Sequence, residues 1–253
     1  CFDRPGFGYS RRPRLRRMTP EAQAAVFEAA LKKLNVREPV VFGHSWGTLV
    51  ALALALRDSD ARRPVKGLVL AAGYYFPTRR WDVWMVSTPA IPVIGDIMCY
   101  TISPILGWLL ARTMIRNLFA PDAVPQAFKE QFPLGLALRP SQLRTTAEES
   151  ALMIPAAARL QSQYRSLSCP LAIYAAGADS LIELDQGPRL QRHTNASVLH
   201  TVQKSGHMLH YAVPEEIVGS IDAMMVAVRL VGSPRLAPTF RAPEGAPAAR
   251  PAR

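Results

Sequence analysis

The sequence predicts an α/β fold: a mostly parallel sheet flanked by helices, with a helical cap, or lid, inserted between core strands. Three short runs, at 40–42, 65–72 and 170–176, are apolar at almost every position, which is typical of strands buried on both faces of a parallel sheet. Helical patterns alternate with these runs, as crossover helices do in such folds. Between the second and third runs the alternation stops, and proline recurs among short apolar pieces.

The first elements are expected between residues 1 and 39. Cys1–Asp3 looks like the end of a strand and leads into a loop punctuated by glycine at 5–10. A helix should follow, because Thr19 is a good N-cap and Pro20 suits the first helical position. Asn35 can end this helix. Its expected apolar face consists of Val26, Phe27, Ala30, Leu31 and Leu34.

The stretch from 73 to 168 predicts a helical insertion, since its prolines separate short apolar segments that carry aromatic residues. It can be a second small core, a lid whose apolar face lines a pocket, or both. We therefore divide the chain into a first core segment (1–72), a lid (73–169), a second core segment (170–231) and a disordered tail (232–253). The tail is rich in proline and arginine and has no aliphatic cluster.

The strand and helix alternation resumes after the insertion, and the C-terminal elements follow from the same patterns. They are a strand at 170–176, a turn at 177–179, a helix at 185–192, a strand at 197–203, a loop at 205–207 and a helix from 214 to about 230.

The net charge of +11 at pH 7 is unusual for a globular chain that is 49% hydrophobic. Basic residues cluster at 11–17 and could meet phosphate or an anionic membrane surface. The cluster has no interleaved aromatic residues and lies in no nucleic-acid-binding motif, which favours a solvated loop. We therefore expect the chain to bind a small-molecule substrate and no nucleic acid. A homodimer remains a possible oligomeric state.

Cysteine usage favours a reducing compartment. The chain has three cysteines, too few and too scattered for a disulfide framework: Cys1, Cys99 and Cys169. It contains no CxxC pair of the kind that binds zinc. The longest uncharged run, 97–111, is shorter than the ~20 apolar residues that span a bilayer. We expect a cytoplasmic protein without a membrane span, metal or cofactor. The abrupt start at Cys1 suggests a fragment; the alternative, an N-terminal cysteine nucleophile, has no support from neighbouring residues.

The pentapeptide Gly43-His44-Ser45-Trp46-Gly47 fits the G-x-S-x-G pattern of a nucleophile elbow. The apolar run 40–42 precedes it, and residues 46–56, rich in Leu and Ala, predict a buried helix after it. A serine on such a sharp turn needs small neighbours so that strand and helix can approach. The N-terminus of the helix would stabilise negative charge developing in front of Ser45.

A nucleophilic serine needs a base, and the base needs an acid that orients it. His207 lies in a loop just after a predicted strand, so its side chain can project over the carboxyl edge of the sheet; His210 is the rival. Asp179 follows the strand that ends at 176. Glu183 and Asp185 are the alternatives, though each suits a helix cap or a surface position better.

These motifs together resemble the α/β-hydrolase fold superfamily, in its serine-nucleophile branch, over residues 1–231. The matching segments are DRPGFGYS (3–10), FGHSWG (42–47), GAD (177–179) and SGHM (205–208). The resemblance implies a triad of Ser45, Asp179 and His207. It argues against the branches that use aspartate as nucleophile, the haloalkane dehalogenases and epoxide hydrolases.

The resemblance also implies an oxyanion hole in which the backbone N–H of Trp46 is one donor. The second donor of the family comes from a loop upstream of the DRPG-like segment. We therefore expect that this chain lacks the N-terminal strands of the family and that its activity is impaired unless the natural protein is longer.

The expected activity is that of a serine hydrolase acting on an apolar or aromatic carboxylic ester. A C–C bond hydrolase and an aminopeptidase-like amidase remain alternatives; for the amidase, Glu148 and Glu149 could bind an amino group, although an acidic pair on a helix is usually solvated. A non-catalytic small-molecule binder is the rival class. The expected substrate contacts are His44, Trp84, Met98, Tyr100, Trp108 and Met208.

Overall fold

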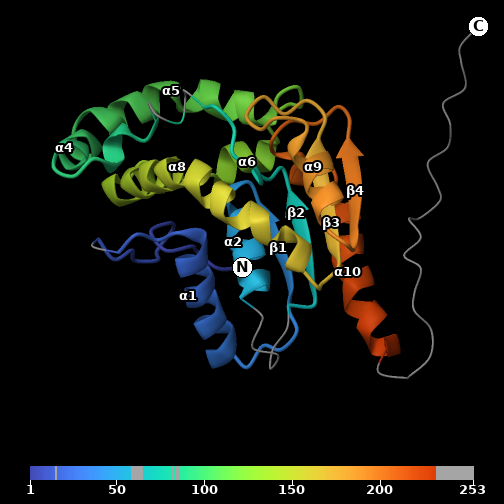
Figure 1. Ribbon diagram of the computed structural model, residues 1–253. Helices are drawn as coiled ribbons and strands as arrows, with labels where there is room; N and C mark the ends of the chain where they lie inside the picture. The colour runs from blue at the N-terminus through green and yellow to red at the C-terminus, as the bar shows by residue number, and fades with distance from the viewer. Residues whose placement is uncertain (15, 58–64, 81–82, 84–85, 232–253) are drawn as a thin grey trace, which may run out of the picture.

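The structure, a computed structural model, describes residues 1–14, 16–57, 65–80, 83 and 86–231. In this part of the chain, one parallel sheet has the strand order β1-β2-β3-β4 (Figure 1). The strands are β1 (Val40–His44), β2 (Gly67–Ala71), β3 (Leu171–Ala176) and β4 (Ser197–Val202). All their carboxyl ends therefore meet at one edge of the sheet. The predicted α/β class is confirmed.

Helices cover both faces of this sheet (Figure 1). Those outside the insertion are α1 (Pro20–Lys33), α2 (Trp46–Leu56), α9 (Gln186–His193) and α10 (Pro214–Val231), with a short 3₁₀ turn at Leu209–Tyr211. The bounds of α2 match the predicted helix 46–56. The Leu- and Ala-rich sequence of α2 is explained by its position, because seven of its residues are buried between the sheet and other helices.

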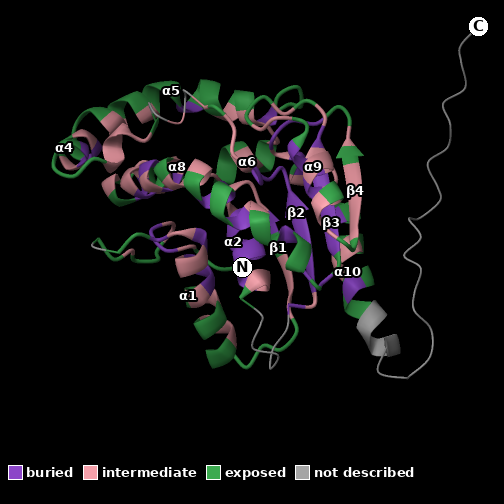
Figure 2. Cartoon of the chain, viewed as in Figure 1, coloured by how far each residue is buried: buried purple, intermediate pink, exposed green. Residues whose placement is uncertain are grey.

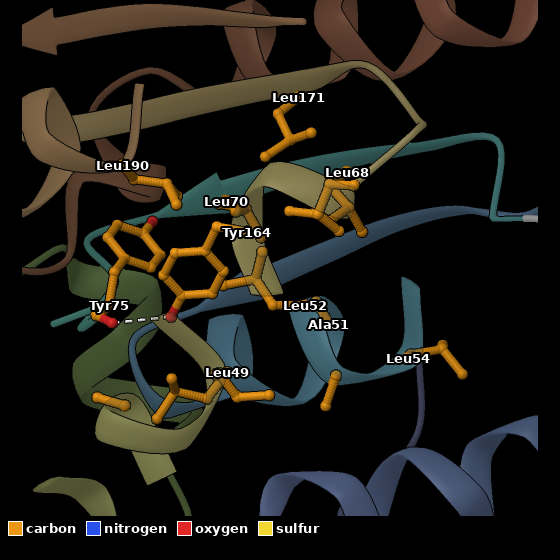
Figure 3. Packing of buried hydrophobic residues seen from close by; sticks show 14 of the residues in the cluster. Leu49, Ala51, Leu52, Leu54, Leu68, Leu70, Tyr75, Tyr164, Leu171 and Leu190 are labelled. Atoms are coloured by element: carbon orange, nitrogen blue, oxygen red, sulfur yellow. Dashed lines mark hydrogen bonds between the residues drawn. The ribbon is translucent and has the colours of Figure 1, made fainter. Parts of the chain in front are cut away.

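Alternate residues of each strand enter two different hydrophobic clusters. In β2, Leu68 and Leu70 belong to the larger cluster on the side of α2, whereas Val69 and Ala71 belong to the cluster on the side of α10. Figure 3 shows the larger cluster, in which the hydroxyl of Tyr164 donates to the backbone oxygen of Tyr75 at 2.8 Å. Burial on both faces explains why the strands are apolar at consecutive positions.

The stretch between β2 and β3 is mostly helical from residue 88 onward, whereas the described residues 72–80 form no helix. It contains a 3₁₀ turn at Thr88–Ala90, α4 (Ile94–Tyr100), α5 (Ile102–Phe119), α6 (Gln126–Gln131), α7 (Leu134–Ala137), α8 (Pro140–Leu160) and a second 3₁₀ turn at Gln161–Ser166. The end of α8 and the turn after it belong to the larger cluster through Ala156, Ala157, Leu160 and Tyr164. This last part of the insertion therefore packs into the main core. The domain division at 73 and 169 stays a prediction.

The start and end of α1 agree with the prediction, but its buried face agrees only in part. Thr19 caps the helix, since its side chain accepts a hydrogen bond from the backbone N–H of Ala22. Val26 and Leu34, predicted to be on the apolar face, are 43% and 60% exposed. The buried side contains Pro20, Gln23 and Ala24, with Phe27 and Leu31 partly buried.

The reason for this different face is a polar residue. Gln23 is fully buried, and its side-chain amide donates to Glu149 Oε1 at 2.8 Å and to the backbone oxygen of Met18 at 3.1 Å. A buried amide with its hydrogen bonds satisfied costs little, whereas an unsatisfied one costs about 1–3 kcal/mol. The rotation of α1 that buries Gln23 exposes Val26.

The prediction of a strand end at Cys1–Asp3 is wrong. No strand of the described residues pairs with this segment, so it has no ladder of hydrogen bonds. Instead, Asp3 closes the following loop: its carboxylate accepts from the N–H of Tyr9, and its backbone oxygen accepts from the hydroxyl of Ser10. Phe2 packs against Phe27 of α1, with ring centroids 5.7 Å apart.

Among the described residues, no single helix is long and apolar enough to cross a membrane. α4 and α5 meet the length and composition criteria only when taken together, and they are bent by 55° at the break between them. The predicted disordered tail at 232–253 lies outside the described residues.

Candidate active site

Ser45 lies at the carboxyl end of β1, directly before the first residue of α2. Its backbone has φ of 52° and ψ of −124°, a positive φ that side-chain-bearing residues rarely adopt. The turn is held by two backbone hydrogen bonds: Ser45 N–H donates to Ala71 at 2.9 Å, and Thr48 N–H donates to Ser45 at 3.0 Å. The local structure is the predicted sharp strand-to-helix turn.

The two glycines of the pentapeptide differ in what they do. A Cβ at Gly43 would lie 2.8 Å from the backbone oxygen of Gly47, so glycine is needed there for strand and helix to approach. A Cβ at Gly47 would meet no described atom within 4 Å. The expected packing requirement therefore holds at Gly43 and not at Gly47, where the added atom would face open space.

Asp179, His207 and Ser45 form one hydrogen-bonded chain. His207 Nδ1 lies 2.8 Å from Asp179 Oδ2, and His207 Nε2 lies 2.9 Å from Ser45 Oγ. The side chains of His207 and Asp179 are only 5% and 3% exposed. Because the Asp179 carboxylate accepts a hydrogen bond from His207 Nδ1–H, the unprotonated Nε2 is left as the acceptor for the hydroxyl of Ser45. The three predicted residues are thus brought together.

The carboxylate of Asp179 is fixed by its own turn. Its second oxygen, Oδ1, accepts from the backbone N–H groups of Leu181 at 2.8 Å and Ile182 at 3.1 Å. These bonds aim Oδ2 at His207. The alternative acids are placed elsewhere: Asp185 is the residue before α9, and Glu183 borders a small cavity beside Asp179.

Two further histidines surround His207. His44 Nε2 donates to the backbone oxygen of His207 at 2.9 Å, and its ring lies 5.0 Å from that of His207 and 4.4 Å from that of His210. Burial, followed by the charges of His210 and His207, lowers the pKa of His44 to about 3. Burial, followed by the charge of His207, lowers the pKa of His210 to about 4. Both rings are therefore neutral at neutral pH and do not repel an imidazolium on His207.

The loop that carries His207 is clasped to the end of α5. Met208 N–H donates to the backbone oxygen of Leu118 at 3.2 Å, and Ser205 Oγ donates to Asp122 Oδ2 at 3.0 Å. Any Cβ at Gly206 would collide with the backbone oxygen of Ala120. Sequence reasoning missed this clasp; Ser205 and Gly206, directly before His207, are its local trace in the sequence.

A second missed residue is Gln186, the first residue of α9. Its buried side chain accepts from the backbone N–H groups of Tyr75 at 2.7 Å and Phe76 at 2.8 Å, and donates back to Phe76 at 3.1 Å. Gln186 thereby fixes the segment that follows β2 at the carboxyl edge. Nothing in its local sequence indicates such a role, since the partners lie about 110 residues earlier.

The remaining predicted substrate contacts are only partly near the triad. His44 and Met208 are next to His207. Met98 is half-buried on α4, and Trp84 lies outside the described residues. Tyr100 and Trp108 are 65% and 67% exposed, and Tyr100 borders a different hollow, beside the N-terminal loop. The role of these residues in substrate binding stays a prediction.

The acidic pair at 148–149 was expected to be solvated, but both carboxylates are bound by arginines. Glu149 is 4% exposed and forms an ion pair with Arg4 at 2.5 Å, and Glu148 forms one with Arg12 at 2.7 Å. Burial raises the pKa of Glu149, with Arg4 and Gln23 opposing the shift. Since arginines already occupy both carboxylates, the pair does not offer an amino-group site. The described residues hold no group of three or more potential metal ligands.

The comparisons with known proteins agree with this fold. The family model described as alpha/beta hydrolase fold matches residues 1–212. The chain therefore belongs to the α/β hydrolase fold family, and this membership marks it as an enzyme. No curated protein matches the sequence.

Several solved structures are similar to this chain. An alpha/beta hydrolase enzyme from a Medee basin deep-sea metagenome library has a TM-score of 0.66 at 16% identity, covering 94% of this chain and 80% of that one. An esterase from Exiguobacterium antarcticum has 0.63 at 16% identity, covering 91% and 80%. A haloalkane dehalogenase from Bradyrhizobium elkani has 0.63 at 18% identity, covering 88% and 80%. At these identities the likeness shows the fold alone.

Proposed function

We propose that this chain is a serine hydrolase that cleaves carboxylic esters of apolar or aromatic small molecules through an acyl-enzyme. The observation that carries the proposal is the hydrogen-bonded chain from Asp179 through His207 to Ser45, at the carboxyl edge of the sheet. A nucleophile, a base and an orienting acid within hydrogen-bond reach form the constellation that acyl transfer requires.

In the first half-reaction, Ser45 Oγ attacks the carbonyl carbon of the ester while its proton passes to His207 Nε2. Asp179 holds the Nδ1 proton and stabilises the imidazolium. The carbonyl oxygen becomes an oxyanion, and the N–H of Trp46 is available to it, because the first N–H groups of an α-helix have no partner within the helix. Collapse of the intermediate breaks the C–O bond, and His207 gives its proton to the departing alkoxide.

In the second half-reaction, water attacks the acyl group on Ser45. His207 Nε2 takes a proton from the water, a second tetrahedral intermediate forms, and the acid leaves as Ser45 regains its proton from His207. The neutral state of His44 and His210 supports this cycle, because His207 is then the one histidine of the cluster that gains a charge during turnover.

We also propose that the helices between β2 and β3 act as the lid of this site. α5 lies above the carboxyl ends of the strands (Figure 1), and its end is hydrogen-bonded to the loop that carries His207. Apolar residues of such a lid would favour substrates with little charge.

The experiment is steady-state hydrolysis of 4-nitrophenyl esters of increasing acyl length, combined with mass spectrometry of the acid-quenched enzyme. We expect turnover that needs Ser45, and an acyl adduct on the Ser45 peptide. The matched variant is Asp179→Asn, for which we expect a fall of about 10⁴-fold in kcat, because the wrong tautomer of His207 is favoured. Full hydrolysis by Ser45→Ala would contradict the proposal.

A further inference from the structure

The outer surface of α4 and α5 is apolar and exposed. We define the α4–α5 face by Ile97, Ile102, Ile105, Trp108, Leu109 and Leu110, each of which is more than half exposed. Figure 2 shows both helices at the rim of the molecule, with exposed residues along the side that points away from the sheet. Monomeric proteins rarely leave such a contiguous apolar patch in water without a function.

The opposite side of the same helices is anchored to the protein. Cys99 of α4 and Ala111 and Phe119 of α5 are buried, and Phe119 packs against Phe128 and Tyr211. The core therefore uses only the inner residues of the two helices. The inner residues of α4 and α5 are packed against the protein, and the two helices are bent by 55° at the break between them. The outer residues can therefore lie on the surface of an apolar layer without the helices crossing it.

A basic hollow borders one end of this face. It has a volume of about 370 Å³ and lies between the N-terminal loop and the start of α8. Tyr100, the last residue of α4, lines the hollow and lies in the sequence between Ile97 and Ile102 of the α4–α5 face. Its lining contains five arginines against a single acid, Glu148; the arginines are Arg11, Arg12, Arg14, Arg139 and Arg144.

Three of the five arginines are already paired with acids, and among the described residues Arg11 and Arg139 form no ion pair. Glu148 is bound by Arg12. Asp96, the sole acid on α4 and α5, forms ion pairs with Arg144 and with Arg14. The hollow therefore retains a net positive charge next to the apolar face.

We propose that the α4–α5 face docks on the surface of an anionic lipid bilayer, with the exposed Arg11 and Arg139 of the basic hollow against the lipid phosphates. Aliphatic residues, a tryptophan and a tyrosine on one side of a helix pair, with arginines at its edge, form the composition of an interfacial membrane helix. An anionic surface attracts each nearby Lys or Arg by about 1 kcal/mol. A second copy of the chain carries the same +11 charge, which opposes self-association through this face.

This docking is independent of the proposed hydrolysis. It rests on surface residues that make no contact with Ser45, Asp179 or His207, so the two proposals can fail separately. Lipid binding is measured without substrate, and Ser45→Ala should bind vesicles as well as the parent chain does.

The test is flotation of the full chain with two kinds of vesicle: phosphatidylcholine alone, and equal parts phosphatidylcholine and phosphatidylglycerol. We expect binding to the anionic vesicles that weakens as NaCl is raised, and much weaker binding to the neutral ones. Tryptophan fluorescence should be quenched by brominated acyl chains, and less so in Trp108→Phe.

Four variants assign the binding to the face and the hollow. Leu109→Glu should lower the affinity for anionic vesicles at least about tenfold, whereas Val218→Glu, an equally exposed change on α10, should leave it unchanged. Arg139→Gln should lower it about fivefold, whereas Arg165→Gln, at an exposed site outside the hollow, should not. All four positions are on the surface, so circular dichroism should show parent-like folding.

Three results would overturn the proposal. The first is equal binding to neutral and anionic vesicles, or no binding to either. The second is equal affinity of Leu109→Glu and Val218→Glu. The third is a dimer in light scattering that Leu109→Glu dissociates, without any vesicle binding, which would identify the face as an interface between copies of the chain.

Discussion

The carboxyl edge of the sheet and the α4–α5 face are both rich in apolar residues, yet the protein uses them in opposite ways. At the edge, apolar strands and α2 are fully packed, and they hold three polar side chains in one hydrogen-bonded chain. At the α4–α5 face, the apolar side chains are more than half exposed. The difference teaches that an apolar sequence alone does not identify the core. Packing against the rest of the protein distinguishes the core residues from the exposed residues of the α4–α5 face.

The largest effect should come from the polar chain at the edge. We expect Ser45→Ala and His207→Ala each to lower kcat for an ester by about 10⁴–10⁶-fold, because each removes a member of a unit that acts together. Ester hydrolysis followed by absorbance measures the loss, and circular dichroism establishes that the variants fold. The double variant should be no slower than the slower single one; a multiplicative loss would show that the two residues do not act as a unit.

The second prediction compares the two regions directly. Leu52 on α2 is fully buried, and Leu109 on α5 is 60% exposed. We expect Leu52→Ala to lower the free energy of unfolding by about 2–5 kcal/mol, since it leaves a cavity, and Leu109→Ala to change it by no more than about 0.5 kcal/mol. Urea unfolding measures both. Similar losses at the two positions would mean that the α4–α5 face is packed after all.

The third prediction concerns the clasp that joins the two regions. Gly206→Ala should collide with the backbone oxygen of Ala120 and displace His207, lowering kcat/KM by about 10²-fold. Gly219→Ala is the matched control: its Cβ would meet nothing within 4 Å on the exposed side of α10, so it should leave activity unchanged and raise stability by up to about 1 kcal/mol. If both variants keep parent activity, the clasp does not position His207.

The fourth prediction concerns the pH dependence of stability. The pKa values of His44 and His210 are lowered in the folded state to about 3 and 4, so in the acid range the unfolded chain binds more protons. The stability these neutral rings contribute is present above the unfolded pKa of about 6.5 and is lost as the pH falls toward 4. His210→Phe should reduce this slope by about 1.4 kcal/mol per pH unit, the effect of one proton.

Thermal or urea unfolding between about pH 7 and 4 tests this dependence. The variant keeps a ring in the place where His210 contacts Phe42, His44 and Tyr211. A slope as steep as that of the parent chain would show that His210 is not a neutral buried group.

Much of the fold could be predicted because its signals are local. The apolar runs that became β1, β2 and β3, the Thr-Pro start of α1 and the bounds of α2 all depend on neighbouring residues. The association of Ser45, Asp179 and His207 was predictable too, since each follows a strand and the carboxyl ends of parallel strands meet at one edge.

The rest depends on contacts between distant residues. The burial of Gln23 requires Glu149, 126 positions away, and the role of Gln186 requires a backbone segment about 110 positions earlier. No periodicity within a helix reveals such a partner. The exposure of Trp108 was unpredictable for a related reason: an apolar residue at a helical position has the same sequence signal whether it faces a pocket or solvent.

The central claim is that Ser45 is activated by His207 and Asp179, and labelling with a fluorophosphonate tests it most directly. We predict a single adduct that peptide mapping places on Ser45, absent from Ser45→Ala and formed much more slowly by His207→Ala. An adduct that forms on Ser45 at the same rate in His207→Ala, or no adduct on the folded parent chain, would contradict it.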